Sequence, residues 1–320
     1  MSKPSGAIDM TQGKPINLML RFALPMMIGS IFQSLYSMVD SAVLGRFVGS
    51  HALAAIGATT STTGLILLLA TGVTSAISIV LSQYVGANDT DRVRKGIVAS
   101  GWITLLLGVV LGLISVFAAR PLMQLLKAPE DVIDMSVLYI QIVCGCGIAQ
   151  FAYNAAASIL RALGDSKTPL YFLVFSSVLN IILDIVFIVP MHMGVAGAAW
   201  ATILSQFLSA VFSTVVGLRN FPILHLRRED FHDLKGAAVL HLKTGFPMGF
   251  QMSVMCIGQL AMQAVVNSLG TAAVAGYTAA SKADQLSVLV NNAMMTAISN
   301  YVAQNFGAGK KDRIRLGVRA

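Results

Sequence analysis

Eight runs of about 20 or more predominantly apolar residues constrain the fold of this chain more than any other feature of its sequence. A helix of about 20 apolar residues is long enough to cross the hydrocarbon core of a bilayer. Only 11% of the 320 residues are charged, against roughly 25% in soluble domains, and the mean hydropathy is +0.75. We therefore predict an all-α polytopic membrane protein, with spans at roughly 16–44, 54–82, 97–118, 134–159, 170–189, 194–217, 244–267 and 273–303.

The basic residues are distributed unevenly among the segments that connect these runs. The N-terminal segment and the loops on its side of the membrane hold 18 of the 22 Lys and Arg residues, whereas the opposite loops hold Arg46, Arg120 and Lys127. Loops enriched in Lys and Arg are typical of the cytoplasmic side. We therefore expect a cytoplasmic N-terminus. The net charge of +8 follows from this topology, and we expect the lipid bilayer rather than nucleic acid as the partner.

An internal repeat appears when the sequence is shifted by 221 residues. The polar block Asp91-Arg92-x-Arg94-x-Gly96 then matches Asp312-Arg313-x-Arg315-x-Gly317, and Gly86-Ala87 matches Gly307-Ala308. Six predicted spans separate the starts of the two copies, so the chain returns to the same side and the copies are parallel. The repeat therefore predicts two lobes related by an axis along the membrane normal.

The repeat also predicts the domain organisation. We expect a complete six-helix N-lobe in residues 1–219 and a cytoplasmic linker in 220–243. A partial C-lobe in 244–320 would contain two helices and the start of the next. Because Ala320 pairs with Ala99, the sequence reads as a C-terminally truncated form of a two-lobe protein with twelve helices.

Two aspartates, Asp40 and Asp184, lie inside predicted spans, where an ionised carboxylate costs about 2.5–3.5 kcal/mol on insertion scales. Asn180 precedes Asp184 by four residues and Ala198 precedes Thr202 by four, so each pair shares a helical face. A rise of about 1.5 Å per residue places both acids and Thr202 in the outer half of the bilayer. Such oxygen atoms can hold sodium, and two carboxyl groups can equally hold a proton.

Four further polar residues lie in the spans that carry or neighbour these acids. Gln33 and Tyr36 precede Asp40 by one to two turns, and Tyr139 and Asn154 lie on the fourth span. Two interpretations stay open, because such residues either line a polar pathway or form hydrogen bonds between helices.

The motifs resemble those of the multidrug and toxic compound extrusion (MATE) transporters from about residue 10 to the end of the chain. The resemblance rests on motifs in the first six spans and the loops between them: Leu20-Arg21-Phe22-Ala23-Leu24-Pro25, Tyr36-x-x-Val39-Asp40, Gly45-Arg46, Ala52-Leu53-Ala54-Ala55-Ile56-Gly57, Ser82-Gln83-x-x-Gly86-Ala87, Arg161-Ala162-Leu163-Gly164-Asp165, Asn180-x-x-x-Asp184 and Gly194-Val195-Ala196-Gly197-Ala198-Ala199. It implies a MATE-type two-lobe helical bundle in the bacterial inner membrane. It also implies an antiporter that exports cationic or amphipathic compounds in exchange for Na⁺ or H⁺ by alternating access.

Within that family the chain is most similar to the DinF-like branch. The resemblance implies that the coupling cation is bound by Asp40, Asn180, Asp184, the carbonyl group of Ala198, and Thr202. Gln33, Tyr36, Tyr139 and Asn154 match the polar network of that branch. If the ion is sodium, its side-chain ligands are Asp40, Asn180, Asp184 and Thr202. The seventh span offers Gln251, Gln259 and Gln263 but no acid, so we expect no second cation site there.

Other functional classes fit the sequence less well. An intramembrane aspartyl protease is expected to contain Tyr-Asp and Gly-x-Gly-Asp, whereas this chain has Val39-Asp40 and Leu183-Asp184, so we predict no enzyme. A lipid-linked precursor flippase of the same superfamily stays an alternative, although its cavity tends to carry several cations and only Lys282 is a candidate here. A fragment that binds the ion without transporting is a third reading. We expect a monomer with no cofactor other than Na⁺ or H⁺, between which the sequence does not choose.

Overall fold

The computed structural model describes residues 7–125, 130–269 and 271–319, and within these ranges the chain is helical with no β-strand. The predicted loop residue Lys127 and the side chain of Lys282 lie outside the described part. The α-helices are α1 (Pro15–Phe47), α2 (Ser50–Gly86), α3 (Thr90–Leu125), α4 (Glu130–Gly145), α5 (Ile148–Ala162), α6 (Lys167–Ile188), α7 (Gly194–Asn220), α8 (Lys235–Ser268), α9 (Thr271–Gly307) and α10 (Lys311–Arg319). Two short 3₁₀ helices, η1 (Pro222–Leu224) and η2 (Arg228–Phe231), connect α7 to α8.

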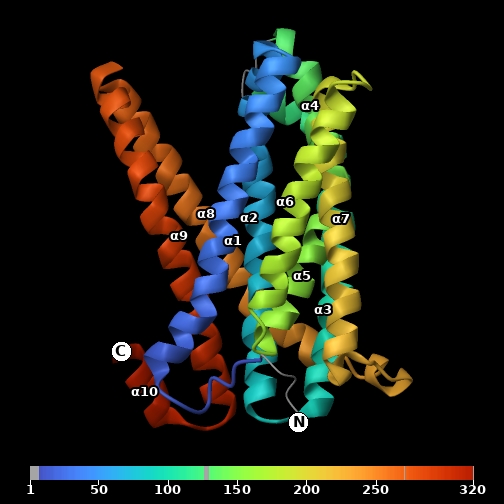
Figure 1. Cartoon of the computed structure of the whole chain (residues 1–320), viewed down its shortest axis with the longest axis vertical. Helices are drawn as coiled ribbons and strands as arrows, with labels where there is room; N and C mark the ends of the chain where they lie inside the picture. Colours follow the sequence, from blue (N-terminus) through green and yellow to red (C-terminus); the bar gives the residue numbers. More distant parts are fainter. Residues whose placement is uncertain (1–6, 126–129, 270, 320) are drawn as a thin grey trace.

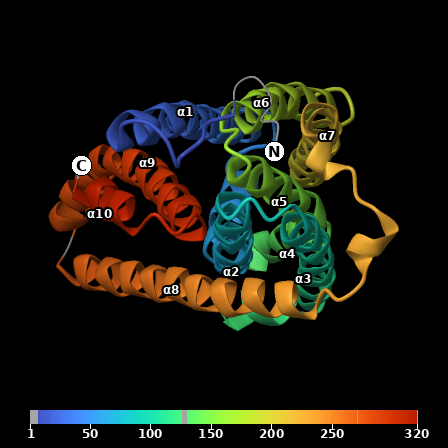
Figure 2. The same ribbon diagram turned by 90° about the horizontal axis from the view of Figure 1, so that it is seen from below.

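The helices form an upright bundle from which two members diverge. Helices α1 to α7 run side by side, while α8 and α9 lean away from them toward the end opposite the chain termini (Figure 1). We call the end that holds both termini and α10 the termini end, and the opposite one the far end. At the termini end α8 packs against α2 and α3, and α9 packs against α1 and α2 (Figure 2). Helix α8 carries exposed apolar side chains along its length, among them Val239, Phe246, Val254 and Met262, each more than half accessible.

Length and hydropathy identify the helices that can cross a membrane. Within the described residues, α1, α3, α6 and α7 are each long and apolar enough to span a bilayer. Helices α4 and α5 meet the same criterion together and would form a fifth span, broken by a bend of 41°. Most of each apolar window remains uncovered by protein, as expected for helices that face lipid. The helices and the composition therefore both identify the chain as an integral membrane protein.

The two copies of the repeat meet at a crossing of α2 and α9. A Cβ atom on Gly86 would overlap the carbonyl group of Gln304, and a Cβ atom on Gly307 would overlap the carbonyl group of Gln83. These contacts are related by the 221-residue shift, because Gly86 corresponds to Gly307 and Gln83 to Gln304. Glycine at both positions lets the two backbones touch. The repeat therefore has a physical counterpart in a nearly symmetric contact between its two copies.

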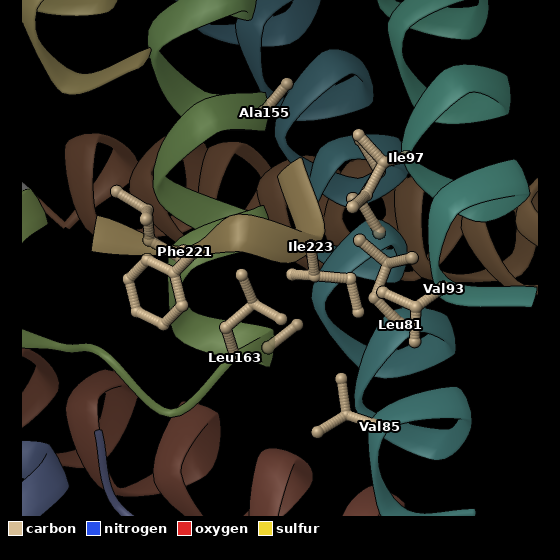
Figure 3. Close-up of a cluster of buried hydrophobic side chains, with 11 residues drawn as sticks. Leu81, Val85, Val93, Ile97, Ala155, Leu163, Phe221 and Ile223 are labelled. Carbon is tan, nitrogen blue, oxygen red and sulfur yellow. The ribbon is translucent and has the colours of Figure 1, made fainter. Parts of the chain in front are cut away.

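An apolar cluster fixes the termini end of the bundle. Leu81 of α2, Val93 of α3 and Leu163 after α5 pack against Phe221 and Ile223 from the segment that follows α7 (Figure 3). Each of these side chains is at most 9% exposed. The segment after α7 is therefore held against α2, α3 and α5.

Two boundaries differ from the predicted spans. The run 134–159, predicted as one span, is broken between α4 and α5 at residues 146–147, where Gly145 and Gly147, residues of low helix propensity, flank the turn. A Cβ atom on Gly112 of α3 would come within 2.9 Å of the carbonyl oxygen of Gly145, so α3 lies against the backbone at the break. Helix α8 begins at Lys235 instead of residue 244, because the end of the polar linker 220–243 is already helical.

Candidate cation site between α1, α6 and α7

The residues of the predicted cation site converge from three helices near the far end. Asp40 lies two turns before the end of α1, and Asp184 lies one turn before the end of α6. Ala198 and Thr202 occupy the first turns of α7, which runs in the opposite direction to α6. Because α6 packs against both α1 and α7, their side chains meet at one level of the bundle.

The two aspartates form a close pair. The carboxyl groups of Asp40 and Asp184 lie within hydrogen-bonding range of each other, and Asp184 is fully buried while Asp40 is partly buried. Tyr36, one turn before Asp40, and Tyr139 of α4 both lie within electrostatic range of the two carboxyl groups. Two ionised carboxylates repel each other at this separation, so the pair is stabilised when a proton or cation is held there.

An amide and a hydroxyl group extend the site from the acids to α7. The Asn180 Nδ2 atom donates a long hydrogen bond of 3.5 Å to Thr202 Oγ1, and Thr202 Oγ1 donates one of 3.0 Å to the carbonyl oxygen of Ala198. Asn180 is 2% exposed and Ala198 is 1% exposed. The side chains of Asn180 and Thr202 and the carbonyl group of Ala198 thus lie together, as the spacing of four residues led us to expect.

Several oxygen atoms in this site are buried without a hydrogen-bond partner among the described residues. They are Oδ1 of Asp40, Oδ1 of Asn180, and both Oδ1 and Oδ2 of Asp184. Buried polar atoms are nearly always hydrogen-bonded, so a group of four unpartnered acceptors indicates that something else satisfies them. Sodium prefers oxygen ligands, and a proton on one carboxyl group would supply a donor, so both ions fit. No cluster of three His, Cys, Asp or Glu residues occurs in the described ranges.

An apolar layer separates the acids from the far end. Leu44 lies one turn beyond Asp40 on α1, and Ile188 lies one turn beyond Asp184 on α6. Both side chains are buried in a cluster with Ala52, Val195 and Ala198, against which Val48 and Met135 also pack. The site is therefore covered on its far side by aliphatic side chains.

The structure places the remaining predicted residues less uniformly. Among the described residues, no hydrogen bond links Gln33 or Asn154 to the acidic pair; Gln33 is exposed and Asn154 is half-buried on α5. Gln206 of α7 was not predicted, yet it lies one turn from Thr202 and is 7% exposed. Its Oε1 atom has no hydrogen-bond partner in the part of the chain that the structure describes. The spacing of four from Thr202 was the signal that could have identified it.

Comparisons with known proteins agree on one family. The MatE family model matches residues 25–186 and 247–320. The probable multidrug resistance protein YpnP of Bacillus subtilis is 35% identical over 96% of this chain and 69% of its own length. A second protein of that organism, the probable multidrug resistance protein YoeA, is 30% identical over 93% of this chain and 66% of its own length. The chain thus spans about two thirds of the relatives that it matches.

Solved structures give the same result. A MOP superfamily transporter from Pyrococcus furiosus superposes with a TM-score of 0.91 at 25% identity, over 99% of this chain and 70% of its own. The same values hold for the outward-facing conformation of a multidrug resistance MATE family transporter. The MATE-type helical bundle expected from the sequence is therefore confirmed, whereas the DinF-like branch stays a prediction. The family model, the curated relatives and the shared fold together show that this chain belongs to the MatE family.

Proposed function

We propose that the protein is a cation-coupled exporter of small cationic or amphipathic compounds, working by antiport and alternating access, and not an enzyme. The proposal is carried by the buried pair of Asp40 and Asp184 with its unpartnered oxygen atoms. The names of the relatives, multidrug resistance and multidrug export proteins, support the class of substrate. This chain spans about two thirds of the length of those relatives, so its activity cannot be read from their names, and the proposal rests on the acidic site that the chain itself contains.

The site suggests how an ion could change the shape of the bundle. Without a cation, repulsion between Asp40 of α1 and Asp184 of α6 favours separation of these helices near the far end. A proton or sodium ion removes the repulsion, and the two helices can pack closely with Asn180 and Thr202 completing the oxygen set. An ion shifts a conformational equilibrium only by the difference between its affinities for the two states. The acidic pair supplies such a difference, because its electrostatic energy depends on the distance between the helices.

The divergence of α8 and α9 supports a two-state cycle. The termini end is closed by the glycine contacts of α2 and α9, whereas α8 and α9 diverge from the other helices toward the far end (Figure 1). If the N-terminus lies in the cytoplasm of a bacterial cell, as the basic loops predict, we propose that this arrangement belongs to a state open to the outside. We propose that the monomer in the inner membrane alternates between this state and one open to the cytoplasm.

Transport in reconstituted vesicles tests the proposal. We expect dye efflux driven by a Na⁺ or pH gradient, with Asp40→Asn and Asp184→Asn each reducing it at least tenfold. Asp134→Asn is the matched control, because Asp134 is an exposed acid that pairs with Arg120 at 3.3 Å. Efflux by both site variants at the level of the wild-type chain would overturn the coupling assignment.

Binding provides a readout that does not depend on transport. A ligand that binds only the folded state raises its stability by RT ln(1 + [L]/Kd), so saturating Na⁺ at constant ionic strength should raise the melting temperature if the ion is sodium. Thr202→Val removes a hydroxyl oxygen that sodium would use and that a proton on Asp184 would not. Loss of the Na⁺ effect in Thr202→Val indicates sodium, whereas pH-driven efflux that persists in this variant indicates protons.

A further inference from the structure

The segment of residues 7–13 precedes α1 and has no part in the proposed ion site. It lies between the turn that joins α5 to α6 on one side and helices α9 and α10 on the other. We call it the N-terminal strap. On one side it contacts the turn between α5 and α6, where the backbone N–H of Ile8 donates a hydrogen bond of 2.9 Å to the carbonyl oxygen of Gly164. Gly164 has φ +91°, and a Cβ atom there would overlap the carbonyl oxygen of Ile8. The strap thus lies directly on the backbone of this turn.

On its other side the strap is held by α9. The backbone N–H of Met10 donates a hydrogen bond of 3.1 Å to Gln304 Oε1, and Gln304 Nε2 donates one of 3.2 Å to the carbonyl oxygen of Ala162. Asn305 Nδ2 donates one of 3.0 Å to the carbonyl oxygen of Met10. The Met10 side chain is fully buried in a cluster formed by α1 and α9. Gln304 therefore links α9 to the strap and to the end of α5 at the same time.

Arg313 of α10 connects most of these groups. Its Nε atom donates a hydrogen bond of 3.2 Å to Asn305 Oδ1, and its NH2 group donates to the carbonyl oxygens of Met10 at 3.4 Å and Gly13 at 2.9 Å. Its guanidinium carbon lies 5.9 Å from the centre of the Tyr301 ring. Lys310 adds a bond of 3.0 Å from Nζ to the carbonyl oxygen of Thr11. Two neighbouring basic residues thus fix the strap through its backbone.

The internal repeat provides a comparison for Arg313. Its counterpart at the 221-residue shift is Arg92, which begins α3 in the same sequence context. The Arg92 side chain is 71% exposed and forms an ion pair of 3.2 Å with Asp89, three residues away. The same residue type at the same place in the repeat therefore forms an exposed local ion pair in one copy and bonds the N-terminal strap to α9 in the other.

We propose that Arg313 is a positioning residue of the transport cycle, which acts through the N-terminal strap to keep the termini end closed. In the state described here, all its partners lie at the junction of the strap with α9 and α10. Opening of this end would separate the turn between α5 and α6 from α9, and would break the bonds through Ile8 and Gln304. The strap and Arg313 therefore favour the state that is open at the far end. The part that Arg313 and the strap would play in transport rests on the proposed function.

Distances between spin labels at the two ends of the molecule test the proposal in the full chain. Labels replace Lys167 of α6 and Lys311 of α10, both exposed at the termini end, in a background without Cys144, Cys146 and Cys256. A second pair replaces Met191 and Leu269, which are 55% and 69% exposed at the far end. We expect Arg313→Ala to raise the ratio of termini-open to termini-closed molecules about tenfold, the equivalent of one net hydrogen bond. The far-end distance should shorten in the same molecules.

Arg92→Ala is the matched control, because it removes the same charge from the corresponding position of the other copy. It should leave both distances unchanged. Lys310→Ala removes one exposed hydrogen bond, preserves the buried groups, and should shift the ratio about two- to threefold. It decides the matter if Arg313→Ala fails to fold by size exclusion and circular dichroism.

The proposal is wrong if Arg313→Ala changes the distances no more than Arg92→Ala does, or if both ends lengthen together. The labels report the arrangement of the helices without an ion gradient or a substrate. A response to Arg313→Ala in a protein that shows no ion coupling would therefore overturn the proposed function while preserving the role of the strap.

Discussion

The contact between Gly86 and Gln304 predicts a large effect for one added methyl group. In Gly86→Ala the new Cβ atom would lie 2.7 Å from the carbonyl carbon of Gln304 and 2.8 Å from its Cα atom. Non-bonded carbon atoms are normally about 3.5–4.0 Å apart, so α9 would have to retreat by roughly 1 Å. Both partners are backbone atoms and cannot rotate away. Overpacking of this kind destabilises proteins by about 1–3 kcal/mol.

Gly57→Ala on the same helix is the control for this substitution. Within the described part of the chain, a Cβ atom on Gly57 would meet no other atom within 4 Å, so the change adds only the helix propensity of alanine, which stabilises by about 1 kcal/mol. The two variants should therefore differ by about 2–4 kcal/mol.

Thermal unfolding in detergent can measure this difference with a thiol-reactive dye once the partly exposed Cys146 and Cys256 are replaced by alanine. The remaining Cys144 is only 2% exposed and reacts when the bundle opens. Gly86→Ala should melt at least about 4 °C below Gly57→Ala, given about 2–4 °C per kcal/mol for domains of 150–250 residues. Equal melting temperatures would show that α2 and α9 do not touch through their backbones, and would refute the reasoning.

Three further substitutions test other parts of the structure. Leu44→Ala empties part of the apolar layer beyond the acids and should lower stability by about 2–5 kcal/mol in the same assay. Asp134→Asn breaks an exposed ion pair with Arg120 and should change stability by less than about 1 kcal/mol. High salt screens this pair in the wild-type chain, so the difference between the two proteins should then disappear. Burial lowers the pKa of His241, so the folded state binds fewer protons than the unfolded state, and stability should fall as the pH drops through about 6.5. His241→Met, which replaces the titratable ring by an apolar side chain, should remove that part of the pH dependence; an unchanged pH profile would contradict the assignment.

The helices were predictable because lipid imposes one requirement on the backbone. Every peptide group in the hydrocarbon core must be hydrogen-bonded within its own segment, so an apolar run of sufficient length is a helix regardless of its neighbours. The run at 194–217 accordingly matches α7, which extends from Gly194 to Asn220. The break after Gly145 was missed because the apolar run continues through it. Gly145 and Gly147 were the local signal, and α3 lies against the backbone there.

The candidate site was predictable only in part, and for the same reason. A spacing of four residues placed Asn180 beside Asp184, and Ala198 beside Thr202, because helix geometry alone determines such pairs. That Asp40 of α1 meets Asp184 of α6 is a tertiary contact, which the sequence indicated through depth and resemblance and not through spacing. Gln206 extends the spacing by one more turn, but a buried amide is common between helices, and only its unpartnered oxygen distinguishes it.

The N-terminal strap shows what a repeat conceals from sequence reasoning. Matching blocks at Arg92 and Arg313 suggest equivalent roles. Arg313, however, bonds the backbone of residues 7–13, which lies beside α9 and α10, whereas Arg92 pairs with Asp89. Two copies with the same motifs thus have different partners at the same end of the molecule. We proposed that the acidic pair near the far end responds to the ion and that the strap stabilises the closed termini end. Both ends of the molecule would then shift the same equilibrium between the two conformations. Ions that act at Asp40 and substitutions that act at Arg313 should then shift the same two distances, and their effects on the free energy of that transition should add, because the sites are far apart and share no partner.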